Sequence, residues 1–126
     1  MQSSEDALAR ALSFGQGLIY VVTGIWPVVS IRTFMAVTGP KRDQWLVKAT
    51  GMLIAVAGAV LTLAAARRTI SPETEALGVG TAATLGAVDV IYVRKGILSR
   101  VYLLDAAFEA VCVLGWLWVR LLRRPE

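Results

Sequence analysis

The hydrophobic positions of this chain fall into four long apolar runs, separated by short stretches of polar and turn-forming residues. The runs cover residues 12–34, 46–66, 76–93 and 101–122. Each is close to the roughly 20 mostly apolar residues that a helix needs to cross a bilayer. We therefore predict an all-α integral membrane protein in which residues 1–126 form a single domain with four transmembrane helices.

The connections between the runs carry the signals that begin and end helices. Thr38, Gly39 and Pro40 form a turn that stops the first helix. Ser71 is a suitable N-cap, because Pro72 follows at the first helical position. The remaining expected boundary residues are Asp43 and Ser99 as N-caps, Arg67 and Arg68 at a helix end, and Gly96 just beyond one. Since short connections make neighbouring helices antiparallel, we predict an up-down-up-down four-helix bundle.

Composition narrows the possible functions. Apolar residues make up 56% of the chain and charged residues only 17%, against about 25% charged in a soluble domain. The net charge of +4 arises from basic residues at the ends of the runs, where they meet lipid headgroups, so we do not expect nucleic-acid binding. The chain has no His and one Cys, Cys112, so it lacks the usual ligand sets for metal or haem, and we expect no cofactor.

Orientation and source are less determined by the sequence. Six basic residues fall on one predicted side and seven on the other, a balance that does not decide orientation under the positive-inside rule. An even number of spans places both termini on the same side. Arg outnumbers Lys by ten to three, which favours a bacterial cytoplasmic (inner) membrane as the location.

Small residues at helical spacing indicate which helix faces approach one another, because small side chains mark helix contacts in a bilayer. One stripe lies on the second run and comprises Gly51, Ala55, either Gly58 or Ala59, Thr62 and Ala66. Another lies on the third run, at Gly78, Ala82 and Gly86, and Asp89 continues its face. We expect the two stripes to bring the second and third transmembrane helices together.

Polar residues form stripes on the first and fourth runs. The stripe on the first run comprises Gln16, Tyr20, Thr23, Pro27 and Ser30, and that on the fourth comprises Tyr102, Asp105, Glu109 and Cys112. Because polar side chains avoid lipid, we expect both stripes and Asp89 to face a common interior.

The most informative residues are Asp89, Asp105 and Glu109, three acids within apolar runs. Each charge at a helix centre costs roughly 2.5–3.5 kcal/mol on insertion scales, so these side chains should face protein rather than lipid. Antiparallel helices place Asp89 and Asp105 at similar depth, and Glu109 lies one turn deeper, about 6 Å. The candidate ligand-binding residues are these three acids with Arg32, Tyr20, Tyr92, Tyr102, Gln16 and Trp26.

Two interpretations of the acids follow. In the structural one, Asp89 pairs with Arg32 or Arg94, Asp105 lies near Arg100, and Glu109 is protonated, so that the acids specify which helices meet. In the functional one, they bind a small lipophilic or cationic ligand, with aromatic side chains as walls, or a membrane protein partner. An oligomer that exports organic cations in exchange for protons is the alternative, and a membrane enzyme acting on a lipophilic substrate is the third hypothesis.

Overall fold

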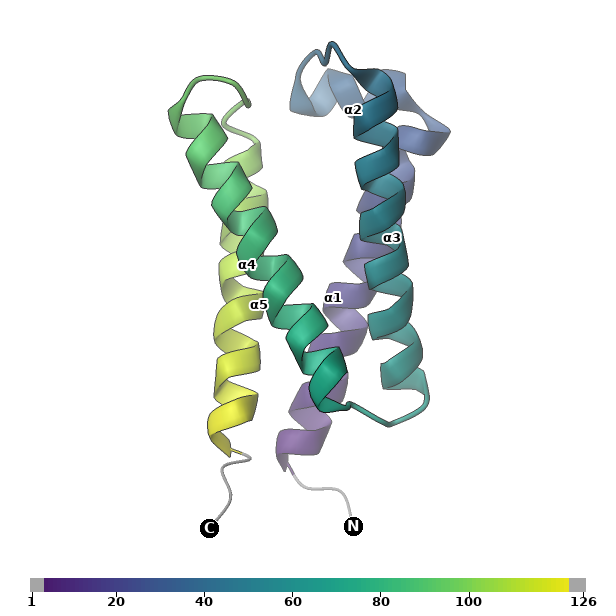
Figure 1. The fold of residues 1–126 in the computed structure, drawn as a ribbon, viewed down its shortest axis with the longest axis vertical. Helices are drawn as coiled ribbons and strands as arrows, with labels where there is room; N and C mark the ends of the chain where they lie inside the picture. The colour runs from purple at the N-terminus through teal and green to yellow at the C-terminus, as the bar shows by residue number, and fades with distance from the viewer. Residues whose placement is uncertain (1–3, 123–126) are drawn as a thin grey trace.

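A computed structural model describes residues 4–122, and all the regular secondary structure in that range is helical (Figure 1). The helices are α1 (Ser4–Val29), α2 (Ile31–Thr38), α3 (Gln44–Ala66), α4 (Pro72–Arg94) and α5 (Tyr102–Leu122). Every helix except the short α2 is long and apolar enough to cross a membrane. The prediction of an all-α bundle with four candidate transmembrane helices is therefore confirmed.

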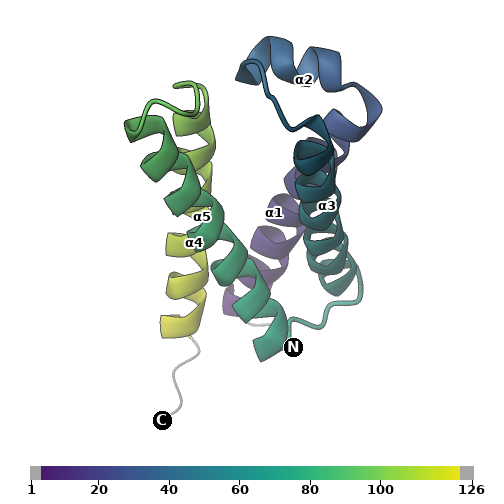
Figure 2. The ribbon, with the colours of Figure 1, turned by 45° about the horizontal axis from the view of Figure 1, so that its top comes forward.

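The first predicted span is divided into two helices, contrary to the expected continuous run over 12–34. Helix α1 starts earlier, at Ser4, and ends at Val29, two residues after Pro27. Proline has no backbone N–H and disturbs the preceding helical turn. Ser30 then begins a new helix as its N-cap, because its side chain accepts a hydrogen bond from the Thr33 amide at 3.3 Å. The short α2 lies across the end of the bundle, as Figure 2 shows.

The other boundary predictions have mixed outcomes. Ser71 caps α4 by accepting a hydrogen bond from the Thr74 amide at 3.1 Å, and Gly96 takes the left-handed φ of +77° just after this helix. Asp43 occupies the N-cap position of α3 without a capping hydrogen bond from its side chain. Ser99 does not cap α5, because its hydroxyl donates instead to the carbonyl of Thr38 at 2.9 Å.

Helix α3 packs closely against α1, which corrects the expected pairing of the second and third transmembrane helices. A Cβ added to Gly17 would lie 2.7 Å from the carbonyl oxygen of Gly58, and one added to Gly24 would collide with the carbonyl oxygen of Gly51. Each pair of glycines is seven residues apart on its own helix, which is two turns. The small-residue stripe of α3 thus meets a matching pair of glycines on α1 that was not singled out in the sequence.

The small-residue stripe of α4 packs against α5, so the molecule consists of two helical hairpins, α1–α3 and α4–α5. Gly78 lies under the indole of Trp116, since an added Cβ would be 2.5 Å from the indole nitrogen. Gly86 lies beside Glu109, whose Cβ is 3.2 Å from the corresponding position. The ribbons of the two hairpins are closest near the start of α1 and diverge toward α2 in both views (Figures 1 and 2).

Large apolar side chains cover the outside of the bundle. Val29, Leu53 and Leu104 expose 78%, 71% and 74% of their surface, respectively, and many other large apolar residues on the helices are also exposed. Such a surface suits contact with lipid tails rather than water. Together with the four long apolar helices, it indicates a membrane-embedded protein.

Candidate functional site

A network of buried hydrogen bonds joins α1, α4 and α5 in the middle of the molecule. The Trp116 indole donates to Gln16 Oε1 at 2.6 Å, and the Gln16 amide nitrogen donates to the Gly78 carbonyl at 2.9 Å and to the Tyr20 hydroxyl at 3.1 Å. The Tyr20 hydroxyl then donates to Glu109 Oε1 at 2.6 Å. Gln16, Tyr20, Glu109 and Trp116 are each 1–2% exposed. We call these four side chains the polar network.

Three of its members were expected from the polar stripes, but the stripes are not buried throughout. Thr23 is exposed, and its hydroxyl donates a hydrogen bond to the Ile19 carbonyl of its own helix at 2.8 Å. Its place against α3 is taken by Gly24, which is buried. The common interior predicted for the first and fourth runs therefore exists, with Gln16 and Tyr20 on one side and Glu109 on the other.

Asp89, Asp105 and Glu109, which we call the acid cluster, lie next to one another. Asp105 interacts electrostatically with both Asp89 and Glu109, and Asp89 also interacts with Glu109. Asp89 is 4% exposed, and its Oδ2 atom has no hydrogen-bond partner among the described residues. Within residues 4–122, no basic side chain forms an ion pair with these three acids.

A lysine from the loop between α2 and α3 lies at the end of the bundle that carries α2 and Tyr102. Lys41 Nζ donates to the Thr38 carbonyl at 3.1 Å, to the Thr38 hydroxyl at 3.2 Å and to the Gly39 carbonyl at 2.9 Å. The same ammonium group lies 5.1 Å from the ring centre of Tyr102 and 5.8 Å from that of Phe34. Burial lowers the pKa of Lys41 below its ordinary value. We call these surroundings the Lys41 cage.

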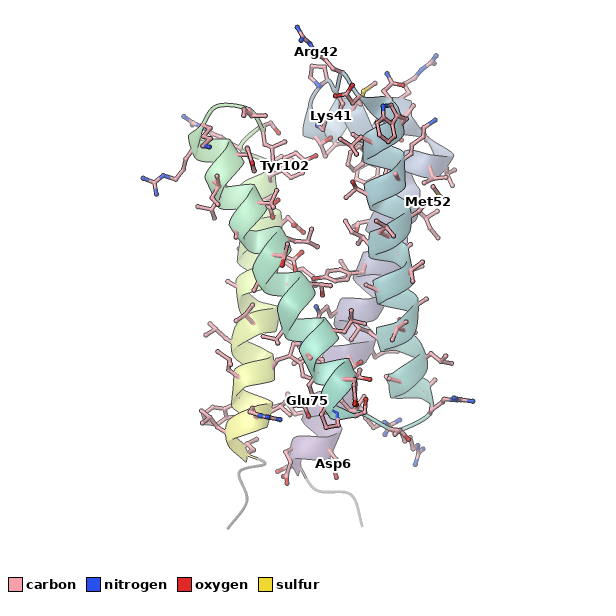
Figure 3. All side chains as sticks on the ribbon, in the orientation of Figure 1. Asp6, Lys41, Arg42, Met52, Glu75 and Tyr102 are labelled. Atoms are coloured by element: carbon pink, nitrogen blue, oxygen red, sulfur yellow. The ribbon has the colours of Figure 1, made fainter. Side chains whose placement is uncertain are left out.

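The cage links the two hairpins. Phe34, Thr38 and Gly39 come from α2 and its loop, whereas Tyr102 begins α5. The hydrogen bond from Ser99 to the Thr38 carbonyl makes a second connection at the same place. Tyr102 also interacts electrostatically with Asp89 and Asp105, so this residue connects the cage to the acid cluster. Figure 3 shows Lys41 and Tyr102 at the end of the molecule opposite Glu75.

The structure separates other candidate residues from this region. Arg32 is exposed and forms no ion pair with the acid cluster. Tyr92 is also exposed, and its ring lies 5.5 Å from the Lys95 ammonium group. Trp26 joins α1 to α2, because its indole donates a hydrogen bond to Thr33 at 2.9 Å and its ring packs edge-on against Phe34 with the ring centres 5.2 Å apart. Gln16, Tyr20, Tyr102 and the three acids are the candidates that the fold brings together.

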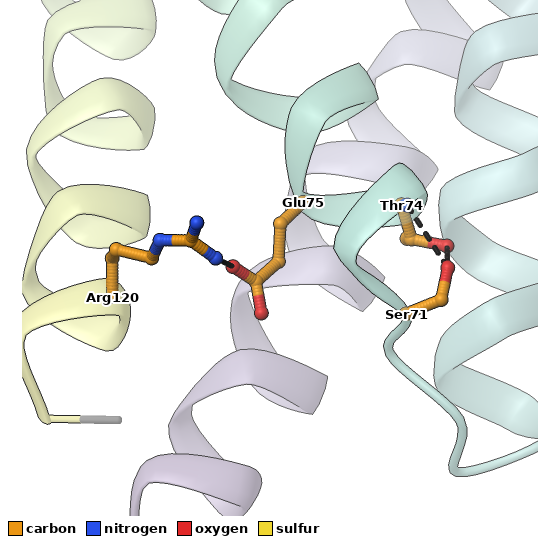
Figure 4. Close-up of polar contacts among 4 residues, drawn as sticks. All are labelled: Ser71, Thr74, Glu75 and Arg120. Carbon is orange, nitrogen blue, oxygen red and sulfur yellow. Dashed lines mark hydrogen bonds and ion pairs between the residues drawn. The ribbon is translucent and has the colours of Figure 1, made fainter. Parts of the chain in front are cut away.

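Several residues of this region were not identified from the sequence. Thr38, Gly39 and Lys41 were interpreted only as a turn and a loop charge, since no periodic pattern extends through them. At the opposite end, Glu75 and Arg120 form an ion pair of 3.6 Å between α4 and α5 (Figure 4). A pocket of about 260 Å³ adjoins this pair, and Trp116 contributes to its wall.

The chemistry available to the acid cluster is recognition of positive charge. Three neighbouring carboxyl groups that have no ion-paired base among the described residues can stabilise a cation, or retain protons when none is bound. Within the described residues, no group of three or more His, Cys, Asp or Glu side chains has an arrangement that could hold a metal ion. The aromatic rings of Tyr20, Phe108 and Tyr102 nearby favour an organic cation. Comparison with known families, with characterised proteins and with solved structures found no match to this chain.

Proposed function

We propose that this protein is a membrane-embedded binding protein for a small lipophilic cation, which the acid cluster holds between the two helical hairpins. The observation that supports the proposal most directly is the buried Asp89 Oδ2 atom, which has no hydrogen-bond partner within residues 4–122. A buried acceptor that lacks a hydrogen bond costs about 1–3 kcal/mol, and a cation bound beside it would offset that cost. We further propose that the protein lies in a bacterial inner membrane with both termini on the same side.

The polar network is assigned a supporting role in this proposal. The side-chain amide of Gln16 uses both donors and its acceptor, and Tyr20 donates to Glu109. These bonds join three helices, as interhelical polar contacts commonly do in membranes. Glu109 is therefore held in a fixed position, whereas Asp89 and Asp105 are the groups that receive the ligand.

Cation binding in lipid nanodiscs made of neutral lipid tests this function. The probes are n-hexylammonium and tetraphenylphosphonium, with n-hexanol as the neutral counterpart of the first, and calorimetry measures their affinity. We expect a cation to bind more tightly than n-hexanol. Asp89→Asn and Asp105→Asn should each weaken binding by about 2 kcal/mol or more, roughly 30-fold in Kd, because each removes a charge from a buried pair.

Asp43→Asn is the matched control, since Asp43 is an exposed acid in the loop beside the same end of the molecule. It should leave affinity unchanged. If neither cation binds, or if all three substitutions have the same effect, the proposal is wrong. If the Asn variants bind normally but unfold more easily in detergent, the acids have the structural role instead.

Proton-coupled export of organic cations is the second candidate, and the contact of Asp105 with both neighbouring acids favours it. Adjacent carboxyl groups exchange a bound cation for protons readily, because they cannot all be ionised at low cost in an apolar medium. In proteoliposomes with an imposed pH gradient, an exporter accumulates tetraphenylphosphonium and loses this activity on Glu109→Gln. Binding without accumulation leaves the binding protein as the function.

A further inference from the structure

Every N–H donor of the Lys41 ammonium group has a hydrogen-bond acceptor. A lysine ammonium has three N–H donors, and the three acceptors are the two Thr38 oxygens and the Gly39 carbonyl, at 2.9–3.2 Å. The Tyr102 and Phe34 rings, at 5.1 and 5.8 Å, add the aromatic contacts that favour cations. The protein therefore contains one built site for an ammonium group, and its own side chain fills it.

The position of this cage matters because Tyr102 connects it to the acid cluster. Tyr102 is a wall of the cage and also interacts with Asp89 and Asp105. Lys41 reaches the cage from a loop, whereas Tyr102 belongs to the opposite hairpin. If Lys41 left the cage for solvent, its three oxygen acceptors would become available to another ammonium group beside the Tyr102 ring.

We propose that the Lys41 cage is the ammonium subsite of the ligand site, that it selects primary alkylammonium ions, and that Lys41 closes it until such a ligand displaces the lysine. This inference rests on the proposed function and narrows its ligand class. The displaced lysine returns to water, and the ligand's ammonium group takes its three hydrogen bonds while its alkyl chain extends toward Tyr20 and Phe108.

The selectivity follows from the acceptors. A quaternary ammonium has no N–H and offers the three oxygens no donor of its own, although it retains the aromatic contacts. A guanidinium is planar and presents its donors in a rigid fork, whereas the cage accepts three donors from one nitrogen atom. A primary ammonium matches both the oxygens and the rings.

Removal of the tethered lysine tests the proposal. In neutral nanodiscs, Lys41→Met keeps the apolar stem and removes the competing charge, so n-hexylammonium should bind about tenfold more tightly, as expected if the open state is populated near 10% in the wild type. The quaternary analogue n-hexyltrimethylammonium should bind more weakly than n-hexylammonium to the same variant. Lys41→Gln provides a second variant should Lys41→Met not fold.

Arg42→Met is the matched control, because Arg42 is exposed in the same loop and points away from the molecule (Figure 3). It removes the same charge and should leave affinity unchanged. Unchanged or weaker binding by the Lys41 variants, or equal binding of the quaternary analogue, overturns the cage as the ammonium subsite. If hexylammonium binding still depends on Asp89 in that case, the proposed function stands. If neither amine binds the wild type or the variants, both proposals are wrong.

Discussion

Two buried acids, Asp89 on α4 and Glu109 on α5, differ in whether their carboxyl oxygens are hydrogen-bonded. Glu109 accepts a 2.6 Å hydrogen bond from Tyr20, whereas Asp89 buries an oxygen without a partner within the described chain. An apolar environment strengthens a hydrogen bond that is formed, and it also raises the free-energy cost of a polar atom that has no partner. Glu109 is therefore held by the polar network, whereas Asp89 keeps an unsatisfied acceptor within the described chain, which is why the proposed function places the cation beside it.

Tyr20→Phe tests the architectural role of the polar network. It keeps the ring and removes the hydroxyl that bonds Gln16 and Glu109. We expect a loss of about 1 kcal/mol in the free energy of unfolding, because interhelical hydrogen bonds in membranes average about 0.6 and reach about 1.7 kcal/mol. Unfolding in mixed detergent micelles measures it. Tyr92→Phe is the control, as Tyr92 is exposed, and equal effects of the two substitutions would contradict this role.

At the scale of helices, glycine determines how closely each pair approaches. Gly17 and Gly24 allow α1 to meet α3, and Gly78 lets the Trp116 ring lie on α4. In a bilayer the surrounding lipid is as apolar as the side chains, so close packing and polar contacts provide most of the attraction between helices. Each hairpin is therefore held together most closely at its glycines, where no side chain keeps the two helices apart.

Gly78→Ala and Gly80→Ala should change stability in opposite directions. An alanine Cβ at Gly78 would lie 2.5 Å from the Trp116 indole nitrogen and displace the ring from its hydrogen bond to Gln16. We expect a loss of about 1–3 kcal/mol from overpacking. No atom of the described residues lies within 4 Å of the same position at Gly80, where alanine should add up to about 1 kcal/mol of helix propensity. Unfolding in detergent compares them, and a stabilised Gly78→Ala variant would refute this packing.

The sequence predicted the elements better than their partners. The lengths of the apolar runs identified four helices, because the thickness of the bilayer sets the length of a spanning helix. Ser71 and Gly96 marked helix ends through capping and a left-handed φ. The small-residue stripe at Gly51 and Gly58 was recognised correctly as a contact face but assigned to the wrong helix. A stripe shows that some helix approaches, and only the matching pair at Gly17 and Gly24 shows which one.

The candidate site was predictable to the extent that it depends on charge in apolar surroundings. Asp89, Asp105, Glu109, Tyr20 and Gln16 are prominent because polar groups are costly in a bilayer, and the fold brings them together. The Lys41 cage was not predictable in this way. It arises from backbone carbonyls where a helix ends and from rings on two separate helices, and backbone acceptors leave no residue-type signal.

Considered as a whole, the molecule consists of two hairpins that meet along the polar network and are connected again at the α2 end by the Lys41 cage and the Ser99 hydrogen bond. The first junction is buried, whereas the second is made by loops and the helix ends next to them. Loop contacts open at a lower free energy than buried helix contacts. Any opening that admits a ligand to the acid cluster should therefore begin at the second junction.

A reversible disulfide across the second junction tests this expectation. A Cβ added to Gly39 would lie 3.8 Å from the Ser99 Cβ, the mean separation in a disulfide. The double variant Gly39→Cys, Ser99→Cys, made with Cys112→Ser, should form a crosslink on mild oxidation. The Gly39 φ of +102° disfavours cysteine by about 1–3 kcal/mol, so the reduced form of the same variant is the control.

Oxidation should slow n-hexylammonium association by about tenfold or more, because it removes the open state from the population that binds ligand. A reductant should restore the rate. Equal rates in the two redox states would mean that the ligand enters elsewhere, between the transmembrane helices.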